Sequence, residues 1–336
     1  MTDQTAIPMS PEAAQELIHT SLGLWGMAGS AYKILRHNEN LACQVDDPSG
    51  NRYLLRICQP KTTALAGIQQ EVDAIESEMA WVQAIRRDTG LPLQAPAASL
   101  RGRYVEEVRH PEEDRTVPVL LLTWVHGEML NQKEPDAERL LASVGRVQRT
   151  LHDQGRGWQR PDWFRRPLYD EASLLNVLPP LRRGVEAGII RSEHYELVRQ
   201  ASDRTVEILG SAPKTPEFWG PIHMDWMGNL VIAEDTPVPI DFSLSGLGFY
   251  LQDVAQCISN IKKPLRPSYL VGYGRAFSAE ELVQISAYIL MIIFITAGRN
   301  VFNPEWREWI QTRRFPVIVG EFCPKLLSGE PFHLDL

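Results

Sequence analysis

The spacing of apolar residues changes along the chain, and this change limits the folds open to it. Residues 31–58 hold three runs of β-forming residues separated by turn signals, which is typical of antiparallel strands. Residues 68–87 carry apolar residues three and four apart, as in an amphipathic helix, and strand-like runs follow at 102–108 and 117–125. After Gly127 helical spacing recurs in four segments, 137–154, 171–187, 192–209 and 279–298. We therefore expect an α+β fold, in which a small antiparallel sheet with one helix precedes a larger, mainly α-helical part.

Composition favours a globular protein that needs no covalent or metal staple. A chain of 336 residues buries about three quarters of its unfolded surface when it folds. Its four cysteines lack a C-x-x-C pair, so neither a zinc site nor a disulfide framework is expected, and a reducing, cytoplasmic compartment fits best. The N-terminal residues show neither the basic nor the apolar region of a secretory signal. The longest apolar run, Tyr288–Ala297, is too short to cross a membrane and is expected to belong to a buried helix.

The charges of the chain argue against nucleic acid as a partner. Lysines and arginines number 34 against 42 aspartates and glutamates, a formal net charge of −8. The basic residues are dispersed rather than gathered in one stretch, so the electrostatic footprint of a nucleic-acid binder is missing. We therefore expect a small-molecule partner, no nucleic acid and no membrane, with the oligomeric state left open.

Residues 219–242 form a short β-like island between the helical segments, and they hold the most informative polar residues. His223, Asp225 and Asn229 stand close together in HMDWMGN, and Asp241 follows after two short apolar runs, LVIA and VPI. A hairpin of these two runs brings Asn229 and Asp241 to one place. Phosphoryl transfer needs such a set, because a carboxylate accepts the proton of the hydroxyl while hard oxygen ligands hold Mg²⁺ on the nucleotide phosphates. Asp225 is the expected base, and Asn229 and Asp241 are the expected metal ligands.

The island and its surroundings resemble the aminoglycoside phosphotransferase and choline kinase superfamily, which has a protein-kinase-like fold. HMDWMGNLVI followed by PIDF resembles the catalytic loop and the metal-binding strand of that family, and other stretches keep the family's order along most of the chain. The subgroup that it most resembles includes homoserine-kinase-like, spectinomycin-kinase-like and stress-response-kinase-like members. The resemblance implies two lobes, a nucleotide-binding lobe at 1–125 and a catalytic and acceptor-binding helical lobe at 126–336.

The resemblance also implies roles for residues of the first lobe. Arg56, in RYLLRIC, takes the place of the basic residue that grips the nucleotide phosphates, and Glu78 takes the place of its ion-pair partner. The backbone from Thr123 to Val125 resembles the hinge that meets the adenine. Asn38 lies in the turn that is expected to cover the phosphates. The implied cofactors are ATP and Mg²⁺, with the choice between ATP and GTP left open.

Three further residues are expected to support the catalytic loop or the helix beneath it. His223 is expected to orient the loop by hydrogen bonds rather than to carry a proton. Asp253, in GLGFYLQDVA, resembles the residue that steadies the loop through its backbone. His152 ends a stretch that resembles the helix packed beneath the active site, and we expect it to be a packed or capping residue.

Four features depart from the family pattern. Met224 stands where glycine or alanine is usual, and Ser243 stands where an acidic residue often follows. Arg56 replaces a lysine, which keeps the charge and adds a bidentate fork. The turn at 37–40 contains no glycine, so side chains and backbone amides are expected to cover the phosphates there.

The sequence leaves the acceptor open. Residues 151–220, which are expected to face it, contain ten basic and ten acidic residues. This neutral balance gives no support for a polycationic aminoglycoside, and a neutral or zwitterionic metabolite, amino alcohol or sugar-like compound fits at least as well.

Two other interpretations stay open, a protein Ser/Thr kinase of the stress-response type and a non-catalytic nucleotide-binding pseudokinase module. The aromatic segment 158–169 either stacks on a substrate ring or anchors a connector to the helical lobe, and we favour the anchor.

Overall fold

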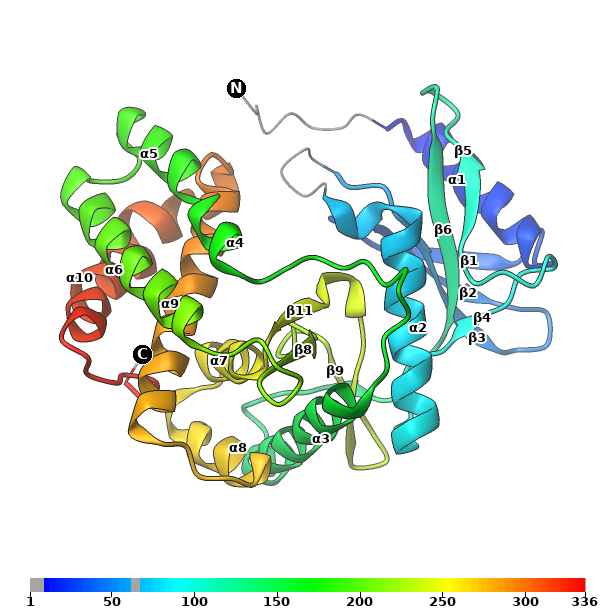
Figure 1. Cartoon of the computed structure of the whole chain (residues 1–336). Coiled ribbons are helices and arrows are strands. Elements are labelled where there is room, and N and C mark those ends of the chain that lie inside the picture. Colours follow the sequence, from blue (N-terminus) through cyan, green and yellow to red (C-terminus); the bar gives the residue numbers. More distant parts are fainter. Residues whose placement is uncertain (1–8, 62–66, 336) are drawn as a thin grey trace. The chain divides into compact units, whose positions relative to one another are not determined.

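The structure is a computed structural model that describes residues 9–61 and 67–335. The chain forms two compact units (Figure 1). The first unit holds the described residues up to His126 together with Arg160–Arg166, and the second holds Gly127–Gln159 and the chain from Pro167 onward. Strands dominate the first unit and helices the second, so the α+β class predicted from the sequence is confirmed.

The first unit is built on one antiparallel sheet with the strand order β1-β2-β3-β6-β4, and β5 also pairs with β6. These strands are β1 (Ala31–His37), β2 (Leu41–Asp46), β3 (Arg52–Ile57), β4 (Pro96–Ala97), β5 (Glu106–Arg109) and β6 (Thr116–Thr123). Successive side chains of a strand point to opposite faces. Arg56 of β3 therefore faces away from Leu55 and Ile57, which belong to the apolar core on the other face.

Two helices accompany this sheet, although the sequence predicted one. The predicted helix is α2 (Val72–Thr89), whereas α1 (Pro11–Leu24) was not predicted. Leu17, Ile18 and Leu22 of α1 complete the core that contains Leu55 and Ile57. The start of α1 has a clear local cause, because the Ser10 hydroxyl accepts the Ala13 N–H at 3.0 Å and a proline occupies the first helical position.

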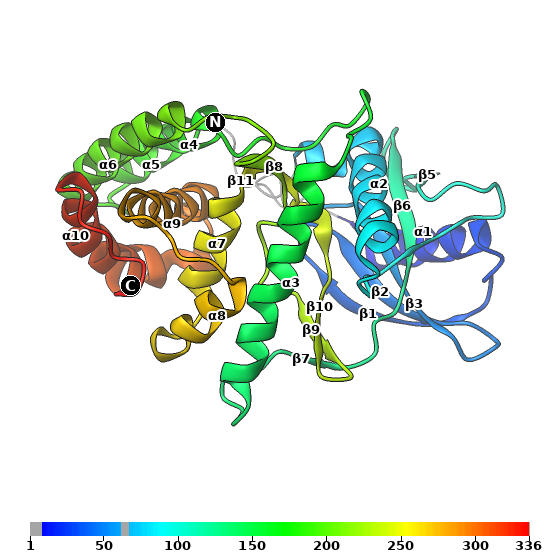
Figure 2. The same ribbon diagram turned by 60° about the horizontal axis from the view of Figure 1, so that its bottom comes forward.

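The second unit is mainly helical (Figure 2). Its helices are α3 (Ala137–Gly157), α4 (Glu171–Leu175), α5 (Leu178–Glu186), α6 (Ser192–Ser211), α7 (Tyr250–Asn260), α8 (Arg266–Tyr273), α9 (Ala279–Asn300) and α10 (Arg314–Leu327). The α3 and α8 backbones pack directly together at two glycines. A Cβ atom on Gly145 would lie 2.3 Å from the Tyr269 carbonyl oxygen, and one on Gly272 would lie 1.9 Å from that of Ala142. Only glycine allows this contact.

Two small sheets interrupt the helices, where the sequence placed the β-like island. One has the order β10-β9-β7, with β7 (Glu128–Met129), β9 (Leu230–Ala233) and β10 (Thr236–Pro239), and the other pairs β8 (Trp219–Ile222) with β11 (Gly246–Phe249). The predicted hairpin of LVIA and VPI is therefore confirmed as β9 and β10. It turns through Glu234 and Asp235, both of which have positive φ.

Several helix predictions were wrong in extent. The helix predicted at 171–187 is two short helices, α4 and α5, because Pro179 and Pro180 lack the N–H groups that a continuous helix needs. The sequence also gave no helical prediction for α7, α8 or α10. Among the described residues only α9 is long and apolar enough to span a membrane. Of its most apolar 18 residues 61% are buried within the structure, as predicted for a core helix.

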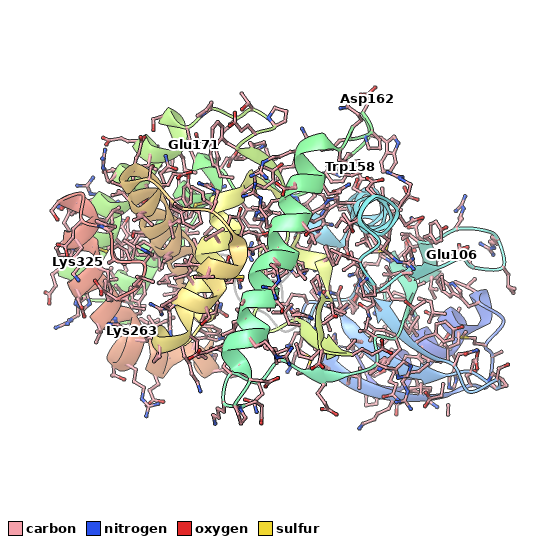
Figure 3. All side chains as sticks on the ribbon, turned by 90° about the horizontal axis from the view of Figure 1, so that it is seen from below. Glu106, Trp158, Asp162, Glu171, Lys263 and Lys325 are labelled. Atoms are coloured by element: carbon pink, nitrogen blue, oxygen red, sulfur yellow. The ribbon has the colours of Figure 1, made fainter. Side chains whose placement is uncertain are left out.

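Ion pairs fasten the C-terminal segment to the second unit. Lys325 of α10 and Lys263, which are both labelled in Figure 3, lie 3.2 and 4.0 Å from carboxylate oxygens of Asp335. Phe332 is buried beside Phe322 of α10. These contacts hold the C-terminal end of the described chain against α10.

Candidate active site

Asp225, the expected base, is oriented by Asn229 within the loop 223–229 that follows β8. Asn229 Nδ2 donates to the Asp225 carbonyl oxygen at 2.9 Å and to Asp225 Oδ2 at 2.7 Å. Asn229 is buried, whereas Asp225 is half-buried. The amide therefore fixes the direction of the carboxylate while its own oxygen, which cannot donate, remains available to another partner.

His223 ties this loop to the segment that leads to Asp241. Its ring is fully buried and packs on Trp226 and Phe242, with ring centroids 5.2 and 4.5 Å apart. The Asp225 N–H donates to Nδ1 at 3.2 Å, and Nε2 lies 3.1 Å from the Ile240 carbonyl oxygen. These partners assign the ring proton to Nε2, because Nδ1 accepts and a carbonyl oxygen cannot donate. His223 thus has the orienting geometry that the sequence predicted.

The hairpin of β9 and β10 brings Asn229 and Asp241 to one locus. Leu230 pairs with Pro239, and the Ile240 N–H donates to the Asn229 carbonyl oxygen at 2.9 Å. Asp241 is the next residue and adopts a left-handed conformation with φ of 59°. Its Oδ1 accepts the Ser243 N–H at 3.4 Å.

This pair of side chains fits a magnesium ion. A carboxylate and an amide oxygen are the hard donors that Mg²⁺ takes, usually from one or two protein groups with water and phosphate oxygens completing the shell. In the described part of the chain no three His, Cys, Asp or Glu residues cluster so as to hold a metal by themselves. An ion held by Asn229 and Asp241 would therefore draw its other ligands from water and nucleotide.

Met224 stands in a strained backbone position between the orienting histidine and the expected base. Its φ is 65°, in the left-handed region that side chains with a Cβ atom disfavour. Its N–H donates to Asp253 Oδ1 at 2.7 Å. A glycine at this position would adopt the same conformation at no steric cost, whereas an alanine would share the strain of Met224.

Asp253, on α7, holds this loop through backbone N–H groups, as expected. Its Oδ2 accepts the His223 N–H at 2.9 Å and lies 3.2 Å from His152 Nε2, while Oδ1 binds Met224. Burial alone raises the pKa of Asp253, but the bonds from His152 and His223 outweigh it and hold the pKa below its usual value. The carboxylate is therefore ionised and acts only as an acceptor.

His152, on α3, supports Asp253 from behind. Both side chains are almost fully buried, and burial lowers the pKa of His152 despite the neighbouring carboxylate. The neutral ring donates from Nε2 to Asp253 and accepts the Tyr273 hydroxyl at Nδ1, 2.8 Å away. His152 was predicted to be a packed or capping residue, and it is packed, with a specific hydrogen-bonding role toward the loop support.

In the first unit, Arg56 and Glu78 form the ion pair that the resemblance implied. Arg56 Nη1 and Nη2 donate to the two Glu78 carboxylate oxygens at 2.8 and 2.9 Å. Only 5% of the Arg56 side chain and 1% of the Glu78 side chain are exposed. A planar guanidinium fork matches both oxygens of a carboxylate, so the replacement of lysine by Arg56 produces a bidentate bond.

Arg166 is a second cation on the same carboxylate, and sequence reasoning missed it. Its Nη1 lies 3.6 Å from Glu78 Oε2 and donates to the Ala74 carbonyl oxygen at 2.9 Å. Arg166 is buried. Two buried guanidiniums therefore share one buried carboxylate.

Arg165 fastens the same segment to α2. Its backbone N–H donates to the Ser77 hydroxyl at 2.8 Å, and its guanidinium pairs with Asp73 at 2.8 Å and with Glu71. The double arginine in WFRRPLYD was a possible signal, but its partners are far along the chain. The expected anchor of the aromatic segment 158–169 to the helical lobe was wrong for residues 160–166, which belong to the first unit. It is found at Tyr169, which is buried in the second unit and whose hydroxyl donates to the Leu244 carbonyl oxygen at 2.6 Å.

The other expected nucleotide-binding residues lie at strand ends and turns of the first unit. Thr123 ends β6, and its hydroxyl accepts the Ala95 N–H at 2.9 Å. Val125 follows two residues later and is half-buried. Asn38 is exposed in the turn between β1 and β2, where its carbonyl oxygen accepts the Lys61 N–H at 2.7 Å. Nucleotide contacts by these three residues stay predictions.

These features define a protein-kinase-like phosphotransferase. A strand-rich unit carries a buried Arg–Glu pair, and a helical unit carries an oriented aspartate beside an asparagine and a second aspartate at a hairpin. The chain belongs to the Phosphotransferase enzyme family, whose pattern matches residues 32–288. A search of curated proteins returned no match.

Solved structures with this fold include kinases of small molecules. A microcompartment-associated aminopropanol kinase is 22% identical, with a TM-score of 0.76 over 94% of this chain and 98% of its own. An amicoumacin kinase in complex with AMP-PNP, Ca²⁺ and Ami is 16% identical, with a TM-score of 0.73 over 96% of this chain and 97% of its own. A spectinomycin phosphotransferase in complex with ADP and spectinomycin is 13% identical, with a TM-score of 0.62 over 94% and 98%.

Proposed function

We propose that this protein is a cytoplasmic kinase that transfers the γ-phosphate of ATP to a hydroxyl group of a small molecule. The observation that carries this proposal is the Asp225 carboxylate held in one orientation by Asn229 at 2.7 Å. A general base needs this fixed orientation, because proton transfer requires hydrogen-bond contact with the reacting hydroxyl. Asp225 is half-buried, so a substrate hydroxyl can reach it.

In the proposed reaction the hydroxyl oxygen of the acceptor attacks the γ-phosphorus. Its proton passes to Asp225, and the bond from the γ-phosphorus to the β,γ-bridging oxygen breaks, with the electron pair leaving on ADP. His223 and Asp253 keep the backbone of the loop in place while this occurs. Catalysis then depends on position and electrostatics, since the protein forms no covalent bond to the phosphoryl group.

Asn229 and Asp241 are the residues that would hold Mg²⁺. The bound ion would neutralise charge on the β- and γ-phosphates. The amide of Asn229 serves two partners in this proposal, because Nδ2 orients the base and the amide oxygen is left for the ion. The amicoumacin kinase of similar fold was solved with AMP-PNP and Ca²⁺, which supports a nucleotide and a divalent cation here.

The first unit is proposed to bind the nucleotide through the cluster around Glu78. Arg56 and Arg166 bring two guanidiniums to one carboxylate, and guanidinium groups are well suited to bind phosphate oxygens. Arg56 would contact the phosphates, with Asn38 covering them from its turn. The backbone from Thr123 to Val125 would meet the adenine.

The acceptor class rests on charge and on the relatives. The neutral balance of residues 151–220 favours an acceptor that is neutral or zwitterionic, such as an amino alcohol or a sugar-like compound. Aminopropanol and spectinomycin are named for two kinases of the same fold. Both names describe small molecules rather than proteins, and we propose that class of acceptor here.

Replacement of the base tests the proposal. Asp225→Asn should lower phosphoryl transfer by about 10²–10⁴-fold, because the amide cannot accept the proton, while the Kd for ATP stays near that of the unmodified protein. Transfer is measured with γ-labelled ATP and Mg²⁺ against a panel of amino alcohols and sugars. Asp162→Asn, at an exposed aspartate outside the loop, is the control. Unchanged turnover in Asp225→Asn contradicts the assignment.

The same experiment separates the two other interpretations. Label that enters polypeptide rather than small molecules, when a cell extract is the acceptor, indicates a protein kinase. Binding of ATP without Mg²⁺-dependent turnover on any acceptor indicates a non-catalytic module. Loss of transfer in Asp225→Asn with a labelled small molecule supports the proposed function.

A further inference from the structure

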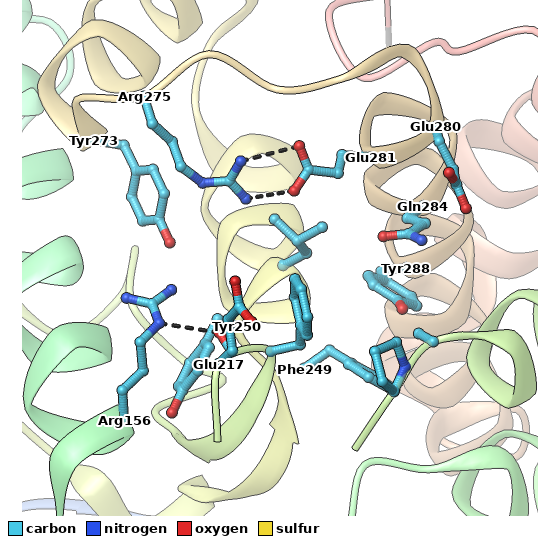
Figure 4. Close-up of a pocket in the computed structure, with 14 residues that line it drawn as sticks. Arg156, Glu217, Phe249, Tyr250, Tyr273, Arg275, Glu280, Glu281, Gln284 and Tyr288 are labelled. Carbon is cyan, nitrogen blue, oxygen red and sulfur yellow. Dashed lines mark hydrogen bonds and ion pairs between the residues drawn. The ribbon is translucent and has the colours of Figure 1, made fainter. Parts of the chain in front are cut away.

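The second unit contains a cavity of about 220 Å³ that no step of the proposed reaction uses (Figure 4). Its walls come from the C-terminal end of α3, the connection from α6 to β8, the start of α7, the connection from α8 to α9 and the first turns of α9. The volume suits a small organic molecule rather than a macromolecule.

This cavity lies at the opposite end of a strand pair from the loop with Asp225. Ile222 pairs with Gly246 at the end of the β8–β11 ladder that continues into the loop, and Trp219 pairs with Phe249 at the other end. Phe249 lines the cavity. Three residues along a strand span about 10 Å, so the cavity is a site of its own, and neither Asp225 nor the expected metal ligands line it.

The two arginines of the cavity are already paired within the protein. Arg275 donates to both carboxylate oxygens of Glu281 at 2.7 and 2.9 Å. Arg156 lies over the Tyr250 ring at 4.7 Å, donates to the Glu217 carbonyl oxygen at 3.0 Å and pairs with Asp153. Neither guanidinium therefore provides a free positive charge for an anionic ligand.

By contrast, one face of α9 presents polar groups that have no partner among the described residues. Glu280, Gln284 and Tyr288 are four residues apart, so they stand above one another on the helix. Their exposure falls along the row, because Glu280 is exposed, Gln284 is half-buried and Tyr288 is 1% exposed. The Tyr288 hydroxyl is buried without a hydrogen-bond partner, which is costly unless something binds it.

A second carboxylate, that of Glu217, lines the cavity apart from this row, beside Arg156 and Tyr250 (Figure 4). Glu217 is exposed, and its carboxylate has no ion pair within the described chain. Phe249 and Tyr250 supply aromatic walls. Uncommitted carboxylates at the mouth, aromatic faces in the wall and a lone hydroxyl at depth match a protonated amine with an apolar body and a polar far end.

We propose that this cavity binds a small primary amine that carries a hydroxyl group several carbons away. Its ammonium group lies at Glu280, and its hydroxyl reaches Gln284 and Tyr288. The backbone positions of Glu280 and Tyr288 are about 12 Å apart along the helix axis. Because both side chains extend into the cavity, the distance between the Glu280 carboxylate and the Tyr288 hydroxyl, which the ligand must bridge, is shorter. A chain of four carbons between the two polar groups is a suitable probe.

Calorimetry with three matched probes tests the charge preference. 4-Amino-1-butanol should bind, whereas 1,4-butanediol should bind at least about tenfold more weakly because it cannot pair with a carboxylate. 4-Hydroxybutyrate, which has the opposite charge, should show no binding. Equal affinity for the amine and the diol, or tighter binding of the acid, overturns the proposal.

Three variants locate the binding. At low ionic strength, Glu280→Gln should weaken binding of the amine by about fivefold or more, since it removes one carboxylate. Tyr288→Phe removes only an unpartnered hydroxyl, so the protein should fold normally and lose part of its affinity. Asp225→Asn should bind the amine as the unmodified protein does. Binding that survives the first two changes and disappears in Asp225→Asn would place the amine at the acceptor site and overturn the proposal, whatever the outcome for phosphoryl transfer.

Discussion

Glu78 in the first unit and Asp253 in the second are both buried carboxylates, and they are held in different ways. Glu78 in the first unit lies between two guanidiniums, with Arg56 at 2.8 Å and Arg166 at 3.6 Å. Asp253 in the second unit instead accepts the backbone N–H groups of His223 and Met224 together with a neutral histidine ring. Both are about 1% exposed.

The difference shows two uses of a buried negative charge. In the Glu78 cluster the partners are permanent charges, so the carboxylate offsets the cost of burying them. At Asp253 the partners are dipoles of a loop, so the carboxylate fixes a backbone conformation that the loop does not prefer. The stability of the Glu78 cluster should depend most on charge. The stability of the arrangement around Asp253 should depend most on pH and on the backbone of the loop.

Removal of the charge of Glu78 should have the largest effect on stability. Glu78→Gln removes the carboxylate that two buried guanidiniums share, and breaking a buried pair in this way costs about 3–5 kcal/mol. The measurement is urea-induced unfolding followed by circular dichroism. Glu76→Gln, at an exposed position of the same helix, should change stability by less than about 0.5 kcal/mol. A cost for Glu78→Gln as small as that of the control would show that the cluster is not held by charge.

The sequence predicted both carboxylates but not all of their partners. Arg56 and Glu78 were predicted as a pair, and Asp253 as the support of the loop, from the family resemblance. Arg166 was not, since its role depends on a segment that leaves the helical unit and lies along α2. No local pattern encodes a contact between residues so far apart, and a double arginine in a loop is usually solvated.

The prediction of helices from local sequence patterns was likewise incomplete. The helix α3 was predicted because one face is apolar and the other charged, whereas the shorter helix α7 was not predicted although it also has an amphipathic pattern. The helix α1 did carry a signal, Ser10 followed by Pro11 and Glu12. The residues of the candidate site were predicted, but the left-handed backbone at Asp241 was not, because it depends on how the hairpin ends.

A fall in pH should destabilise the hydrogen-bonded arrangement around Asp253, because His152 takes up a proton. Burial lowers the pKa of His152 from its ordinary 6.5, so the unfolded chain binds a proton more readily than the folded one. This contribution to stability is complete above pH 6.5 and is lost as the pH falls toward the lowered pKa, by at most about 1.4 kcal/mol per pH unit.

The contribution of His152 to the pH dependence of stability is found by comparing the unmodified protein with a His152 variant. Urea unfolding of the unmodified protein between pH 5 and pH 8 should be compared with that of His152→Gln, which does not titrate in this range. The variant should be less stable at pH 8 because it loses the ring between Asp253 and Tyr273, and its stability should fall less steeply below pH 6.5. Parallel curves for the two proteins would show that His152 is not the titrating group.

The backbone of the loop should give the smallest effect, with a sign that identifies its cause. Met224 has a φ of 65°, and the left-handed conformation costs a residue with a Cβ atom about 1–2 kcal/mol. Met224→Gly removes this cost, while the greater freedom of glycine in the unfolded chain offsets about 0.5–1 kcal/mol of the gain. We expect a net stabilisation of about 0.5 kcal/mol in thermal unfolding.

Met227→Gly is the matched control for this change. Met227 lies in the same loop and is half-buried like Met224, but it is not among the residues with positive φ. Glycine there removes no strain and should destabilise the protein by about 0.5–1 kcal/mol. Opposite signs at the two methionines would show that Asp253 holds the loop in a strained form. Destabilisation at both would mean that the Met224 side chain contributes more by packing than its backbone loses by strain.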